Sequence, residues 1–301
     1  MLSSSCEVCI ESNCPPSSNL KKQRTINHEV SLKGIAVFTG ETVSLRISPS
    51  EINSGIVFQR TDLPHQPLLP AKLENVQGTP RCTIIGKDGV SIQTVEHILA
   101  ALQAYDIDNL LIEIDGPEVP IFDGSSLAFV EAIEKAGLCE QEGWKNRFQL
   151  SAPLFWSQGD IHLIALPSNE YRISYTLHYP QSKILRSQFY SVPVNQETFK
   201  NEIAPCRTFS LYEEIVPLIE KGIIKGGSLE NGVIIKGDEI VNTEGVRFQD
   251  EMVRHKILDM IGDLSLIEHA FTAHIIAIRS GHTSNHAFAK ELLNHIKMES
   301  S

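Results

Sequence analysis

Apolar and polar residues follow two different periods along this chain, one typical of strands and one typical of helices. Alternation with a period of two predicts strands at 43–47, 55–60, 109–115, 171–179 and 274–278, and glycine turns predict hairpins over 82–92, 148–166 and 233–241. Helical spacing predicts helices at 94–102, with Thr94 as N-cap, and at 124–136, 196–202, 211–221, 248–264 and 284–297. The mixture indicates an α+β fold.

The order of these elements repeats in the two halves of the chain. VEHI at 95–98 begins a helix that precedes the strand NLLIEID, a loop and a helix, and VRHK at 253–256 lies in a helix that precedes the strand HIIAI, a loop and a helix. We infer a duplicated α+β unit, with domains at 25–145 and 146–301 and a polar linker at 139–146. His97 and His255 then hold equivalent places, and packing the halves face to face would bring them together.

The first 24 residues have little hydrophobicity and no periodicity, which predicts a disordered extension that can be removed. No basic region precedes an apolar stretch there, so a secretory signal is not indicated. Three of the six cysteines, Cys6, Cys9 and Cys14, lie in this tail and the others are scattered. This is not a disulfide framework, and it favours a reducing cytoplasm; a metal site on the tail cysteines is the weaker alternative.

The net charge argues against nucleic-acid binding, and the hydropathy argues against a membrane-spanning helix. The net charge of −11 argues against nucleic-acid binding, which normally needs a basic surface. No run approaches the roughly 18 apolar residues that a membrane-spanning helix needs. A length of 301 residues suits two medium-sized domains or one large one.

His255 and Asp259 stand four residues apart, so a helix places both on one face, where they supply two ligands to one cation. His97 is the third ligand that we expect, and two histidines with one aspartate form a donor set suited to zinc, with iron as an alternative. Glu96 beside it would take the proton of an attacking water. The alternatives are a surface His–Asp pair and a hydrogen-bonded histidine at a helix start.

Three further segments carry candidate chemistry. His282 follows the last strand, where it could act as a general acid held by Asp263; a solvated loop histidine is the alternative. Lys256 could meet a phosphate, or it is a surface lysine. The segments CRTF at 206–209 and KGGS at 225–228 offer Thr208, Phe209 and a glycine loop, although glycine pairs mostly mark turns.

Taken together, SIQTVEH (91–97), CRTF (206–209), GGS (226–228), RFQDEMVRHKILDMIGD (247–263) and SGHTSN (280–285) resemble the zinc-dependent UDP-3-O-acyl-N-acetylglucosamine deacetylases. The resemblance runs from about residue 24 to the C-terminus. It implies duplicated two-layer β-α-α-β units, with the sheets outside and the helices packed between the two domains. It also implies a cytoplasmic hydrolase that removes acetate from the 2-acetamido group of its UDP-linked substrate, the committed step of lipid A biosynthesis in Gram-negative bacteria.

The resemblance also implies a role for each matched residue. Zinc would be held by His97, His255 and Asp259, with Glu96 as general base, His282 as general acid and Asp263 as its orienting partner. Thr208 would aid the oxyanion, Lys256 would contact the diphosphate, and Phe209, Gly227 and Ser228 would contact substrate. An insert near 179–189 would build the acyl-chain passage. Transient contact with the inner membrane is left open, and no pattern in the chain indicates an oligomeric state.

One segment departs from the family. The early turn, commonly GxGLHxG, reads GIAVFTG at 34–40, so that Ala36 and Phe38 replace glycine and histidine. The change concerns a substrate contact and not the metal ligands.

Two other interpretations stay open: a catalytically silent relative that binds the nucleotide sugar or a partner, and a zinc amidase for a different acylated sugar.

Overall fold

The computed structural model describes residues 20–299 and confirms the α+β class and the duplication. Each half contains a five-stranded sheet in which the neighbouring strands are paired antiparallel, antiparallel, parallel and antiparallel. The first sheet has the order β2 (Val30–Ile35), β3 (Thr42–Pro49), β9 (Leu110–Ile114), β4 (Ile56–Arg60), β5 (Leu68–Pro70). The second has the order β11 (Leu154–Gln158), β12 (Ile161–Leu166), β19 (His274–Ile278), β13 (Arg172–Tyr179), β14 (Arg186–Pro193).

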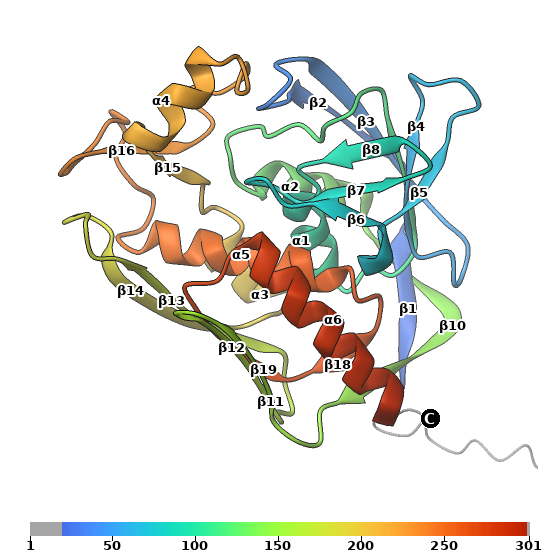
Figure 1. The fold of residues 1–301 in the computed structure, drawn as a ribbon. Helices are drawn as coiled ribbons and strands as arrows, with labels where there is room; N and C mark the ends of the chain where they lie inside the picture. Colours follow the sequence, from blue (N-terminus) through green and yellow to red (C-terminus); the bar gives the residue numbers. More distant parts are fainter. Residues whose placement is uncertain (1–19, 300–301) are drawn as a thin grey trace, which may run out of the picture.

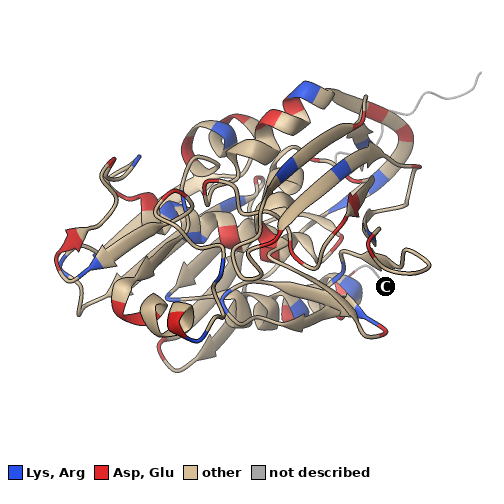
Figure 2. Cartoon of the chain, turned by 90° about the horizontal axis from the view of Figure 1, so that it is seen from above, with Lys and Arg blue, Asp and Glu red and all other residues tan. Residues whose placement is uncertain are grey.

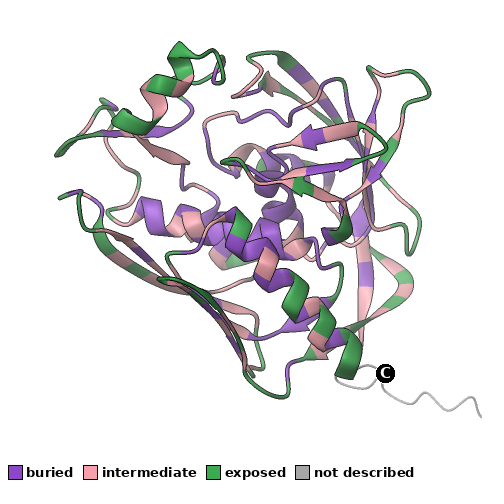
Figure 3. Cartoon of the chain, in the orientation of Figure 1, coloured by how far each residue is buried: buried purple, intermediate pink, exposed green. Residues whose placement is uncertain are grey.

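Two long helices from each half lie between these sheets (Figure 1). They are α1 (Glu96–Ala104) and α2 (Leu127–Ala136) from the first half, and α5 (Glu251–Ser265) and α6 (His282–Glu299) from the second. Helices α1 and α5 pack against each other and are buried over most of their length (Figure 3). The first turn of α1 therefore faces the middle of α5, and this contact joins the halves of the candidate site.

Each half carries an insertion at the same place, between an edge strand of its sheet (β5 or β14) and the first of its two central helices (α1 or α5). The first insertion contains η1 (Leu73–Asn75) and a small sheet of β6 (Val76–Gly78), β7 (Ile84–Lys87) and β8 (Val90–Gln93). The second contains α3 (Gln196–Thr198), a π-helical turn (Phe199–Ile203), β15 (Phe209–Leu211), α4 (Tyr212–Glu220), β16 (Val233–Lys236) and β17 (Glu239–Ile240). Both insertions border the junction of the halves.

A third sheet corrects two of the predictions. Strand β10 (Leu138–Gln149) pairs with β1 (Leu20–Ile26) and with β18 (Ala270–Thr272), so residues 139–146 are strand and not a linker. Residues 20–24 likewise belong to β1 and not to a disordered extension, whereas residues 1–19 lie outside the described part. The sequence concealed both strands because their inward side chains are polar: Lys145 pairs with Asp108, and Gln23 donates to Asn53.

Helix α1 also begins differently from the prediction. Its N-cap is Val95, and Thr94 adopts a positive φ of 62° instead of capping the helix. The Thr94 hydroxyl lies 3.4 Å from a carboxylate oxygen of the buried Glu118. Helix α6 begins at His282, two residues before the predicted start, which matters for the site below.

Candidate metal centre and its acid–base neighbours

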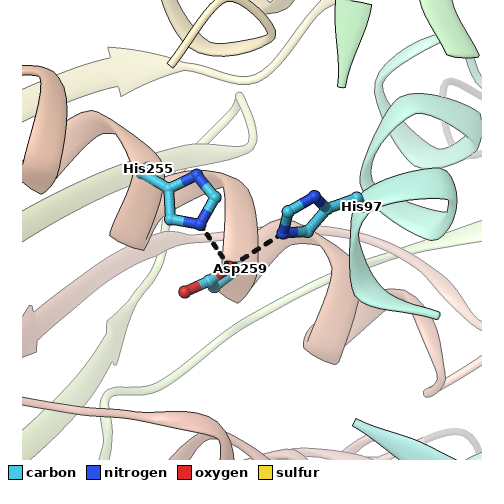
Figure 4. Close-up of side chains that lie close together, drawn as sticks. All are labelled: His97, His255 and Asp259. Carbon is cyan, nitrogen blue, oxygen red and sulfur yellow. Dashed lines mark ion pairs between the residues drawn. The ribbon is translucent and has the colours of Figure 1, made fainter. Parts of the chain in front are cut away.

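His97, His255 and Asp259 form a buried group at the contact of α1 and α5 (Figure 4). Asp259 Oδ1 lies 3.8 Å from His97 Nε2 and 3.3 Å from His255 Nε2. Ligands about 2.0–2.1 Å from a tetrahedral zinc are roughly 3.3–3.5 Å apart, so the spacing fits such an ion with little rearrangement. The structure thus brings together the three predicted ligands from both halves of the chain.

The protonation of these residues suits metal binding. His255 Nδ1 lies 3.0 Å from the carbonyl oxygen of Cys206, to which it can donate, and this leaves Nε2 free to face the other ligands. Burial, with a smaller effect of the neighbouring His255, lowers the pKa of His97 to about 3, and burial also lowers the pKa of His255. Both imidazoles are therefore neutral near pH 7, the form that binds a metal ion.

Asp259 supplies the negative charge of the group. Burial by itself would raise the pKa of Asp259, but the nearby Lys256 and histidines lower it below its usual range. Lys256 Nζ contacts Asp259 Oδ2 at 2.6 Å, so the lysine expected to meet a diphosphate is paired with a ligand carboxylate. Its ammonium also lies 5.8 Å from the centre of the Phe209 ring.

Two local contacts hold α5 against its neighbours at the site. Gly262 of α5 lies against the backbone of Glu96, where a Cβ atom would come within 2.1 Å of the Glu96 carbonyl oxygen. Near the start of α5, Arg207 Nε contacts the carboxylate of Glu251 at 2.9 Å, and both side chains are buried. This ion pair fixes the segment whose Cys206 carbonyl orients His255.

The two predicted acid–base residues face each other beside the ligands. Glu96 Oε1 lies 3.9 Å from His282 Nε2. Burial raises the pKa of Glu96 to about 7, although the positive charge of His282 opposes the shift. Burial by itself would lower the pKa of His282, but Asp263, whose Oδ2 lies 2.8 Å from His282 Nδ1, raises it to about 9. Near neutral pH, before a metal binds, the histidine can donate a proton and the glutamate can accept one.

Asp263 contacts three residues besides its predicted partner His282. Oδ2 also accepts a hydrogen bond from Asn285 Nδ2 at 2.8 Å, and Oδ1 lies 2.6 Å from the Thr83 hydroxyl and 3.3 Å from His286 Nε2. Sequence reasoning missed these three residues. His286 is one helical turn after His282, a signal that was hidden because the helix was expected to start at Ser284. Thr83 carried no signal in the sequence.

A cavity of about 520 Å³ opens beside the metal group. Of the predicted substrate contacts, Thr208, Phe209, Gly227, Ser228 and Lys256 all line it, as do Glu96, His97, Asp259 and His282. Its remaining wall is largely apolar, with Ile215, Val216, Ile219, Ile224 and Ile234 contributed by the second insertion. The structure therefore places the polar candidate residues at one wall of a largely apolar cavity.

The apolar wall lies elsewhere than the predicted acyl passage. Of the segment 179–189, Tyr179 lines the cavity, whereas Phe189 is exposed. Most of the other apolar residues belong to 205–241, where the sequence predicts a helix and a hairpin, and Val37 and Ile121 come from the first half. Phe38, which replaces the family's histidine, also lines the cavity. The backbone N–H groups of Phe38 and Thr39 donate to the buried carboxylate of Glu118.

Figure 2 shows Asp and Glu interspersed with Lys and Arg along the elements in that view. Within residues 20–299, every helix is too short or too polar to cross a membrane. Fold and site together define an α+β protein with a buried His–His–Asp group of the kind that metal-dependent hydrolases use.

Comparison with known proteins agrees with this class and narrows it. The family model for LpxC, UDP-3-O-acyl N-acetylglycosamine deacetylase, matches residues 23–294, and the chain belongs to this family. A protein of Chlamydia pneumoniae named UDP-3-O-acyl-N-acetylglucosamine deacetylase is 47% identical over 279 residues, covering 92% of this chain and 99% of its own. Proteins of the same name from Chlamydia caviae and Chlamydia trachomatis serovar L2 are each 44% identical, covering 91% and 93% of this chain and 97% of their own.

Proposed function

We propose that this chain is a zinc-dependent deacetylase that removes acetate from the 2-acetamido group of UDP-3-O-(3-hydroxyacyl)-N-acetylglucosamine, the committed step of lipid A biosynthesis, in the cytoplasm. One observation carries the proposal: a donor set for one metal ion, a proton acceptor and a proton donor converge on one wall of a largely apolar cavity. A substrate that carries a 2-acetamido group next to a 3-O-acyl chain needs both parts of this arrangement.

The metal assignment rests on donor chemistry. Two neutral imidazoles and one carboxylate are the ligands of a catalytic zinc, and their spacing fits its tetrahedral geometry. When bound, zinc would supply Lewis-acid activation of the amide carbonyl and of the attacking water. His97, His255 and Asp259 would hold the ion.

Glu96 and His282 divide the proton transfers between them. Glu96, with a pKa of about 7, accepts the proton of the water that attacks the amide carbon. His282 is protonated near neutral pH because of Asp263, and it donates to the nitrogen as the C–N bond breaks, so that the products are acetate and a free amine. The 3.9 Å between Glu96 and His282 lets both reach one reacting group.

The cavity accounts for the remaining substrate contacts. Thr208 lies on its wall and would donate to the developing oxyanion. Lys256 would exchange part of its pairing with Asp259 for the diphosphate, and Phe209, Gly227 and Ser228 would contact the sugar nucleotide. The isoleucine-rich wall of the second insertion would take the 3-O-acyl chain, whose burial is worth about 0.8 kcal/mol per methylene.

Purified, zinc-loaded protein assayed for acetate release tests the proposal. His97→Ala and Asp259→Ala should lose metal and activity together, and Glu96→Ala should keep the metal but lose about 10²–10⁴ in turnover. His162→Ala, at an exposed strand position away from the cavity, is the matched control for histidine removal. Full zinc content and activity in both ligand variants would contradict the metal assignment. Binding of the UDP-sugar without turnover by the wild type would favour a silent relative.

A further inference from the structure

Thr83 is completely buried between the two halves, just before β7, where it contacts the carboxylates of both. Its backbone N–H donates to Glu96 Oε2 at 3.0 Å, on α1 of the first half. Its hydroxyl donates to Asp263 Oδ1 at 2.6 Å, on α5 of the second half. One residue of the first insertion thus holds the proposed base and the carboxylate that orients the proposed acid.

The hydroxyl has a second contact whose direction follows from proton counting. Thr83 Oγ1 lies 2.9 Å from His286 Nε2, and because its only proton goes to Asp263, His286 must be the donor. Asp263 Oδ1 is therefore shared by Thr83 and His286, while Oδ2 is shared by His282 and Asn285. The orientation of Asp263 depends on groups from both halves.

We propose that Thr83 is a positioning residue that sets the relative placement of Glu96 and His282 across the junction of the two halves. The inference rests on the proposed function, because it concerns the same two groups. Glu96 and His282 belong to different halves of the chain, and their 3.9 Å approach depends on how α1 and α6 are held relative to each other. Without the hydroxyl, Asp263 keeps three donors that all come from α6, so its orientation is no longer tied to the first half.

Three variants test this role. Thr83→Val removes the hydroxyl at nearly constant volume and keeps the N–H group that binds Glu96, whereas Thr83→Ser keeps both groups. Thr25→Val is the matched control, because Thr25 is also buried and donates its hydroxyl to the Asn109 carbonyl at 2.7 Å, far along the chain from the site. We expect Thr83→Val to lower kcat about 10- to 100-fold with little change in KM or zinc content, the size expected for a misplaced catalytic group. Thr83→Ser should recover most of kcat, and Thr25→Val should keep it.

A second readout separates this inference from the proposed function. In the zinc-loaded wild type, ¹⁵N NMR should show His286 with its proton on Nε2, and this resonance should shift in Thr83→Val and not in Thr25→Val. The measurement needs no turnover, so an inactive wild type would refute the deacetylase proposal while the spectrum still tests the Thr83–His286 contact on which the inference depends. A Thr83→Val protein with kcat within twofold of wild type, a Thr83→Ser protein equally impaired, or an unchanged His286 resonance would overturn the inference.

Discussion

Replacing Gly262 by alanine should disable the site without touching any of its side chains. Gly262 lies near the C-terminal end of α5, and the three atoms nearest to a methyl group there would all be backbone atoms of Glu96, at 2.1 Å (oxygen), 2.8 Å (carbon) and 2.9 Å (Cα). Backbone cannot rotate away as a side chain can. The two helices must therefore separate, and the residues on α1 must move relative to His255 and Asp259.

Two opposing energies decide whether Gly262→Ala stabilises or destabilises the protein. Alanine is favoured over glycine inside a helix by about 0.5–1 kcal/mol, which alone would stabilise the variant. Reaching van der Waals distance requires a shift of roughly 1 Å, and forcing extra volume into a packed interior costs about 1–3 kcal/mol. The net result should be a loss of stability. A displacement of about 1 Å at the reacting groups can also cost about 10²-fold in rate.

Urea unfolding, zinc content and kcat/KM measured on one preparation would test these values. Gly143→Ala is the control, because a methyl group on that strand of the third sheet would also clash, at 2.3 Å from Ile52 Cγ2, but with a side chain. It should lose stability and keep its turnover per folded molecule. Gly262→Ala should lose both stability and turnover, with weaker zinc binding.

The reasoning about helix separation would be refuted by a Gly262→Ala protein that is more stable than wild type and fully active. That result would mean that the helices tolerate the methyl group at their present spacing. Equal losses of turnover in Gly262→Ala and Gly143→Ala would instead show that general destabilisation is sufficient.

In the metal-free protein His282 should titrate near pH 9, above its ordinary 6.5, so its contribution to stability is present below about pH 6.5 and is lost as the pH rises through 9. Asp263→Asn should lower that pKa in an NMR titration; an unchanged value would exclude Asp263 as its cause. Deleting residues 1–24 should lower the melting temperature, because it removes most of β1, whereas deleting residues 1–19 should not; equal melting temperatures would show that β1 contributes little. Phe38→His should change kcat/KM by less than about tenfold, since one neutral hydrogen bond is worth roughly 0.5–1.5 kcal/mol. A hundredfold gain would instead indicate that Phe38 severely impairs the wild-type enzyme.

Hydrophobic periodicity located most of the long elements, because apolar residues recur on the faces of these elements that pack into the core. The central helix, predicted at 248–264, spans Glu251–Ser265, and the strand predicted at 274–278 matches β19. The same reasoning failed at β1 and β10, whose inner faces are polar, and at Thr94, whose hydroxyl contacts Glu118 instead of capping a helix.

By itself, the sequence predicted the His255–Asp259 pair on one helix, the duplicated order of elements and His97 as the candidate third ligand, since local spacing and the repeat indicate these. The tertiary structure alone decided how the halves approach. The contact of Gly262 with the Glu96 backbone, the four donors around Asp263 and the apolar wall from the second insertion join residues that are far apart in the chain. Periodicity reports which face of an element is buried and not which element covers it. The contacts of Thr83 and His286 with Asp263 could therefore be recognised only from the tertiary structure.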